Sequence, residues 1–113
     1  MVVSLELKRL QLTDILRRGT IQFLQNLTNE QINAFSETKD KPQVWRLYGI
    51  NYLSEGNNRA AILASRSQEK LEVEYHDEND PYSFLAEPLI EKAEVLRTQG
   101  IFTPHDLWKL KSY

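Results

Sequence analysis

The sequence contains no cysteine among its 113 residues. A disulfide framework, a thiolate nucleophile and a cysteine-ligated zinc or iron–sulfur site are therefore excluded. Uncharged stretches stay far below the ~20 apolar residues that a membrane helix needs. Charged Glu6, Lys8 and Arg9 also interrupt the N-terminal apolar residues before they could form the core of a signal peptide. We therefore predict a cytoplasmic protein without a membrane partner.

Glycine and histidine are also scarce. The four glycines are scattered at positions 19, 49, 56 and 100, so they cannot build a loop that cradles a phosphate. His76 and His105 belong to no short metal motif, and the acidic residues after His76 lack the glycine and glutamate of an EF-hand. Ser67 to Lys70 matches S-x-x-K, but the companion motifs of that enzyme class are absent. We predict no cofactor, no metal site and no catalytic residues.

The composition is that of a folded protein, with 41% apolar and 27% charged residues. Neither an internal repeat nor a linker interrupts it, so residues 1–113 are predicted to form a single domain. Charge is divided unevenly along the chain. Residues 1–66 carry nine Lys/Arg and six Asp/Glu, whereas residues 67–113 carry five and ten. The acidic stretch 69–80 should repel phosphate backbones and attract basic partners.

Helical spacing dominates the first part of the chain. Apolar residues recur at steps of three, four or seven between positions 4 and 27, which predicts one or two N-terminal helices. Thr28 and Gln31 have the spacing of a capping box, in which side chains of the first and fourth residues satisfy each other's backbone N–H groups. A short helix with Ile32 and Phe35 on its apolar side should follow, and Pro42 should end it.

The central segment predicts a small three-stranded antiparallel sheet over about residues 43–76. Aromatic residues and Gly49 favour one strand over residues 43–53, covered on both faces, and residues 59–66 and 71–75 supply the other two. In a single strand, Tyr48 and Tyr52 share a face with Val44, opposite Trp45 and Leu47. Alternatively, the alanine-rich residues 60–64 favour a helix that continues through residue 75.

The last third of the chain predicts a C-terminal helical hairpin. Pro88 suits the first position of a helix, and Gly100 suits its end. Thr103 and Pro104, followed by Asp106, then predict a final helix that contains Trp108. The expected fold class is α+β, with N-terminal helices, the small sheet and this hairpin in sequence order.

Function is predicted from aromatic and acidic residues, since large rings anchor protein interfaces and acidic side chains select basic partners. We predict a non-catalytic protein-binding, adaptor or assembly factor, with a homodimer as one form of assembly. The predicted partner-binding residues are Trp45, Tyr48, Tyr52, Glu72, Glu74, Asp77, Asp80 and Trp108.

Two alternatives stay open. The first is a small nucleic-acid-binding regulator that uses Arg17, Arg18 and a helix-turn-helix-like segment over residues 93–111. Few cations mark that segment, which argues against this alternative. The second is a small enzyme whose site is assembled from distant residues, with His76 or His105 beside a carboxylate.

Overall fold

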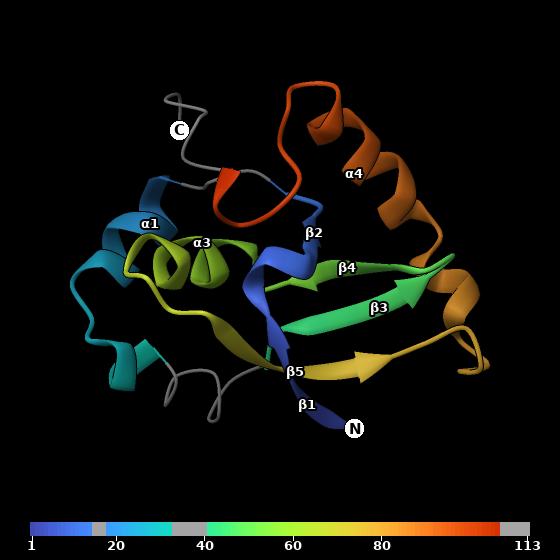
Figure 1. Cartoon of the computed structure of the whole chain (residues 1–113), viewed down its shortest axis with the longest axis horizontal. Helices are drawn as coiled ribbons and strands as arrows, with labels where there is room; N and C mark the ends of the chain where they lie inside the picture. The colour runs from blue at the N-terminus through green and yellow to red at the C-terminus, as the bar shows by residue number, and fades with distance from the viewer. Residues whose placement is uncertain (15–17, 33–40, 107–113) are drawn as a thin grey trace.

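A mixed five-stranded sheet forms the centre of the computed structural model, which describes residues 1–14, 18–32 and 41–106 (Figure 1). The strands are β1 (Val2–Glu6), β2 (Leu10–Leu12), β3 (Gln43–Leu47), β4 (Ile50–Glu55) and β5 (Lys70–His76). Their spatial order is β1-β5-β3-β4-β2. Strands β1 and β5 pair antiparallel, as do β3 and β4, whereas β3–β5 and β2–β4 are parallel pairs. The predicted three-stranded antiparallel sheet is therefore wrong.

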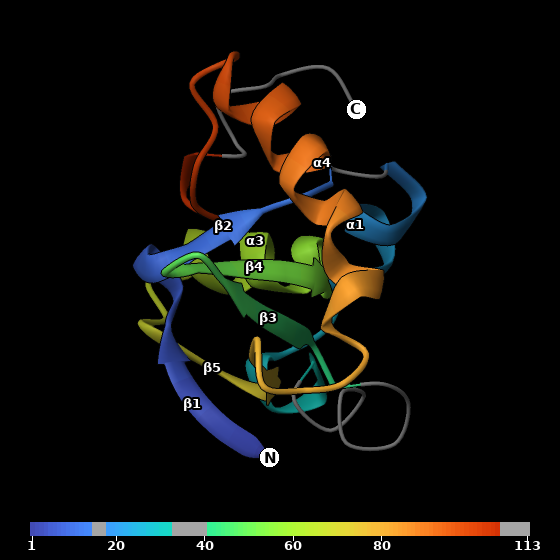
Figure 2. The ribbon, with the colours of Figure 1, turned by 90° about the vertical axis from the view of Figure 1, so that its right-hand side faces the viewer.

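Helices lie on both faces of this sheet. The helices whose two ends are both described are η1 (Leu7–Arg9), α1 (Arg18–Gln25), α3 (Asn57–Ser65), η2 (Ser83–Ala86) and α4 (Pro88–Arg97). Residues 29–32 are also helical, and the rest of the short helix predicted there lies outside the described residues. A larger core joins α1 and α3 to the face that carries Val44 and Leu53. A smaller core joins η2 and α4 to the opposite face, which carries Leu47 and Tyr52. Figure 2 shows α4 in front of the strands and α3 behind them.

Residues 43–53 form a hairpin of two strands rather than the single predicted strand. Tyr48 and Gly49 both have positive φ, 51° and 79°, and make the two-residue turn between β3 and β4. Two positive φ values are the signature of a type I′ turn, whose twist matches that of the paired strands. Because Leu47 then faces Ile50, the side-chain alternation reverses at the turn. Tyr52 consequently shares a face with Trp45, contrary to the single-strand prediction, while the predicted covering of both faces is confirmed.

The alanine-rich residues form helix α3 and not the second predicted strand. Ala60 and Ala61 are completely buried against the sheet, where small side chains allow close packing. The helix ends at Ser65, and Ser67, with φ of 61°, turns the chain into β5. The alternative of a helix that continues through residue 75 is thereby also wrong, since residues 70–76 are a strand.

Over residues 2–12 the predicted N-terminal helices are replaced by β1, η1 and β2, and the helix described within the rest of that segment is α1. Leu7, Leu10 and Leu12 are all buried, although they lie in a 3₁₀ turn and a strand. Apolar spacing that fits a helix is thus produced by two short strands joined by a turn. The capping box is confirmed, because Thr28 N donates to Gln31 Oε1 at 2.8 Å and Gln31 N donates to Thr28 Oγ1 at 3.1 Å.

Helix α4 confirms the first half of the predicted hairpin, with Pro88 at its start and Gly100, at φ of 78°, after its end. The prediction that α4 is the first helix of a helical hairpin is wrong. The chain after α4 returns to the edge of β2, where Leu12 N donates to Phe102 O at 2.8 Å. Ile101 is buried in the larger core at the same place. The body of the predicted final helix, including Trp108, lies outside the described residues.

Candidate functional site

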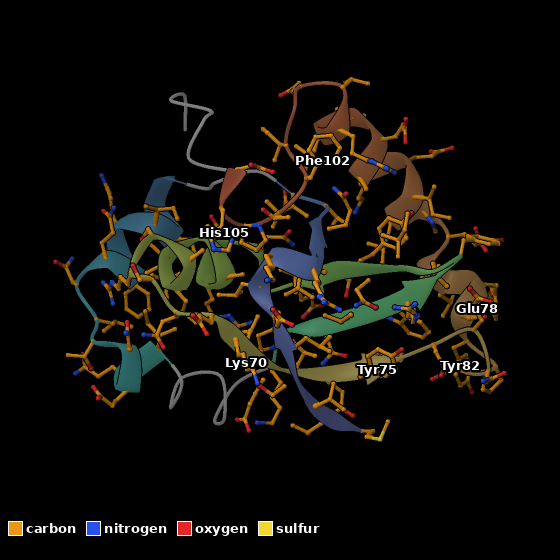
Figure 3. The ribbon with its side chains drawn as sticks, viewed as in Figure 1. Lys70, Tyr75, Glu78, Tyr82, Phe102 and His105 are labelled. Atoms are coloured by element: carbon orange, nitrogen blue, oxygen red, sulfur yellow. The ribbon has the colours of Figure 1, made fainter. Side chains whose placement is uncertain are left out.

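Large apolar side chains are exposed together near the turn end of the β3–β4 hairpin. The aromatic cap, as we name this surface, comprises Tyr48, Tyr82, Phe84 and Leu85 with the flanking carboxylates of Glu78 and Glu87. Its four apolar members are each 63–70% exposed. Figure 3 shows Glu78 and Tyr82 at the same end of the sheet. Clustered exposure of this kind marks surfaces that contact another molecule more often than scattered exposure does.

Tyr48 connects the hairpin turn to both ends of the segment 78–87. Its backbone N–H donates to Glu78 Oε1, and its hydroxyl donates to Glu87 Oε1 at 3.1 Å. The hydrogen bond to Glu87 and the negative charge of that carboxylate raise the pKa of the Tyr48 hydroxyl above its ordinary value. The ring is therefore held in a fixed position although it is exposed to solvent.

Successive turns shape the segment that carries the other members of the cap. Asp77 Oδ1 accepts from Asn79 N at 2.9 Å, and Asp80 Oδ1 accepts from Tyr82 N at 2.8 Å. Such bonds between a side chain and the backbone two residues later are typical of aspartate in turns. The one-turn helix η2 follows, and its Ala86 is buried in the smaller core. A single helical turn that buries only alanine leaves its larger side chains outside.

His76 fixes the base of this segment. Its Nε2 lies 2.8 Å from Gln43 Oε1, and its Nδ1 lies 3.6 Å from Asp80 Oδ2. Its ring stacks on Trp45, with the ring centroids 4.5 Å apart and the planes inclined by 20°. A histidine does lie beside a carboxylate here, but both ring nitrogens and one face have protein neighbours. These contacts place the acidic turn against β3.

The sequence-predicted binding residues fall into separate places. Tyr48 belongs to the aromatic cap, while Trp45, Asp77 and Asp80 lie beneath it in the contacts just described. Tyr52 is only 3% exposed and packs in the smaller core. Trp108 lies outside the described residues.

Glu72 and Glu74 lie on the same sheet face as the smaller core, in the strand β5. Glu72 is exposed. Glu74 Oε1 accepts a hydrogen bond from the Met1 amino group at 2.5 Å. This bond and the positive charge lower the pKa of the Glu74 carboxyl.

Three apolar members of the cap escaped the sequence prediction, namely Tyr82, Phe84 and Leu85. They lie between Pro81 and Pro88, in a stretch too short for an amphipathic helix. Large apolar residues in a short segment between two prolines were the sequence feature that could have predicted their exposure.

Comparison with known proteins identifies no relative: no family model, no curated protein and no solved structure matches the chain. Within residues 1–14, 18–32 and 41–106, no cluster of three or more His, Asp or Glu side chains is arranged to hold a metal ion. No helix in the same residues is long and apolar enough to cross a bilayer.

Proposed function

We propose that this protein is a protein-binding module whose aromatic cap docks a segment of another protein that carries both apolar and basic side chains. The observation behind the proposal is the exposure of Tyr48, Tyr82, Phe84 and Leu85, each 63–70%, on a hairpin turn and a short segment that the hydrogen bonds of Tyr48 join. The sequence prediction of an aromatic and acidic surface is kept, with a different set of residues.

The chemistry of the cap suits protein binding. Tyrosine and phenylalanine offer large contact areas and have few rotatable bonds, which is why aromatic rings dominate interface energetics. The hydrogen bonds of Tyr48 to Glu78 and Glu87 already fix the surface before a partner arrives. Preorganisation of this kind lowers the entropy cost of association.

The negative charge around the aromatic cap indicates that the partner segment is basic. Residues 71–91 contain seven Asp/Glu and no Lys/Arg, and two of these acids, Glu78 and Glu87, flank the exposed rings. A negative rim repels acidic segments and raises the association rate of basic ones. The partner segment should therefore place lysine or arginine beside its apolar anchors.

Selection from a random peptide library on the purified protein would test this proposal. We expect the selected peptides to combine basic with large apolar residues. Fluorescence anisotropy should then show that Phe84→Ala and Leu85→Ala each weaken binding by about thirtyfold or more, the size typical of an interface hot spot. Val95→Ala is the matched control, because Val95 is 59% exposed near the other end of α4 and should leave binding unchanged.

A second arm tests the charge. Glu78→Gln keeps an oxygen that accepts from Tyr48 N but removes the negative charge, so peptide affinity should fall at low salt and change little at high salt. Glu94→Gln, on the exposed side of α4, serves as the control. Selected peptides that are acidic, or that bind Phe84→Ala as tightly as the unaltered protein, would refute the proposal.

A further inference from the structure

The sheet has one edge that no described segment covers. Strand order places β1 and β2 at the two edges. The edge of β2 receives the returning chain, since Leu12 N donates to Phe102 O at 2.8 Å. Among the described residues, nothing pairs with β1 except β5 on its inner side. Figure 2 shows β1 at the end of the sheet opposite β2.

Hydrogen bonds to β5 show which backbone groups of β1 point outward. Tyr75 N donates to Met1 O at 2.8 Å, and Leu7 N donates to Glu69 O at 2.8 Å. In an antiparallel pair, residues alternate between those bonded to the neighbouring strand and those that point away from it. The backbone N–H and C=O groups of the odd-numbered residues of β1 therefore point toward β5. The residues whose N–H and C=O groups point outward are Val2, Ser4 and Glu6.

This edge lacks the usual features that prevent strand pairing. Proteins blunt free edges with proline, bulges or inward-pointing charges. Strand β1 contains no proline, and its register with β5 is unbroken. Its only charged side chain, Glu6, lies at the end of the strand, where Lys8 Nζ at 3.3 Å and Arg9 Nε at 3.5 Å offset its charge.

We propose that a second copy of this chain covers the edge by antiparallel pairing of β1 with β1, centred on Ser4. The strand is self-complementary in this register, because Ser4 faces Ser4 and Val3 faces Leu5 of the second copy. Three outward-facing residue pairs, each exchanging two backbone bonds, give about six hydrogen bonds across a twofold axis.

Apolar side chains also favour this pairing. Val3 and Leu5 are only partly buried in the larger core, and they line a depression of about 230 Å³ with Tyr75 and Arg46. In the proposed register, Leu5 and Val3 of the second copy extend the same apolar strip. This interface uses none of the aromatic cap, so it does not depend on the proposed function.

The absence of cysteine allows a direct test of the register. At the centre of the pairing the two Ser4 Cα atoms should lie about 5.5 Å apart, within the range of a disulfide. Ser4→Cys should therefore form a covalent dimer under mild oxidation. Val2→Cys is the matched control, since Val2 is also exposed but its two copies would lie about 13 Å apart.

A noncovalent test uses sedimentation equilibrium between about 1 and 200 μM, the range expected of small interfaces. The unaltered chain should show reversible dimers. Ser4→Pro removes an outward N–H that β5 does not use, so it should abolish the dimer while circular dichroism stays unchanged; Ser4→Thr should retain it. A chain that stays monomeric throughout this range, or Val2→Cys linking as fast as Ser4→Cys, would overturn the proposal without affecting the aromatic cap.

Discussion

Gly56 is the position where a single methyl group should destabilise the fold most specifically. It has φ of 92° immediately before α3. A Cβ added there would lie 2.8 Å from Pro42 Cβ, 3.0 Å from Pro42 Cγ and 3.2 Å from Pro42 Cα. Pro42 is buried, and its carbonyl accepts from Glu74 N at 2.8 Å where β3 and β5 begin to pair. The proline therefore cannot retreat without straining the sheet.

Two contributions add up in Gly56→Ala. The left-handed backbone costs an L-residue about 1–2 kcal/mol, and overpacking against Pro42 costs about 1–3 kcal/mol more. The free energy of unfolding should therefore fall by about 2–5 kcal/mol. Unfolding entropy per residue implies about 4 °C of melting temperature for each kcal/mol in a chain of this length. The expected loss is about 8–20 °C.

Thermal unfolding followed by circular dichroism measures this loss. Gly100→Ala is the control, because Gly100 has φ of 78° but nothing within 4 Å of the added Cβ. It should show only the backbone contribution, about 1–2 kcal/mol. Equal melting temperatures for the two variants would refute the steric part of the reasoning.

Three further predictions concern single hydrogen-bonded groups. Arg66 donates to Leu27 O at 2.7 Å and to Gln25 O at 3.1 Å at the end of α1, so Arg66→Met should lower urea-unfolding stability by about 1–3 kcal/mol. Asn57→Ala leaves the buried N–H of Thr13 without the side-chain oxygen that accepts from it at 3.0 Å, and chemical denaturation should show a loss of about 1–3 kcal/mol. Glu87→Ala should return the raised pKa of Tyr48 toward 10.0 in an ultraviolet titration. Since that pKa is raised on folding, the bond stabilises the fold below pH 10 and is lost as pH rises through the folded-state pKa.

Local signals in the sequence predicted local structure correctly. The capping box at Thr28, the start of α4 at Pro88 and its end at Gly100 are all confirmed. Each depends on residues a few positions apart, which fold together whatever the rest of the chain does. Signals from apolar spacing were less specific, because two short strands around η1 produced the pattern of a helix.

The β3–β4 turn shows how one missed local feature changes the prediction of a site. Type I′ turns favour asparagine, aspartate or glycine at the first central position and glycine at the second. Gly49 fits this pattern, but tyrosine at the first position concealed the hairpin. That turn reversed the side-chain alternation, so Tyr52 entered the smaller core while Tyr48 remained 70% exposed at the turn. The prediction that Tyr48 binds a partner is kept in the proposal, whereas a buried Tyr52 has no place in it.

The amino-acid sequence alone determined the absence of cysteine chemistry, the uneven division of charge, and the helix caps. Only the tertiary structure decided which side chains of the cap share one surface and which sheet edge is open. The physical reason is that exposure depends on strand pairing between distant segments: β1 pairs with β5, and the hairpin turn meets the segment 78–87 across about 30 residues of chain. Composition and residue spacing do not indicate which distant segments will come into contact in the folded chain.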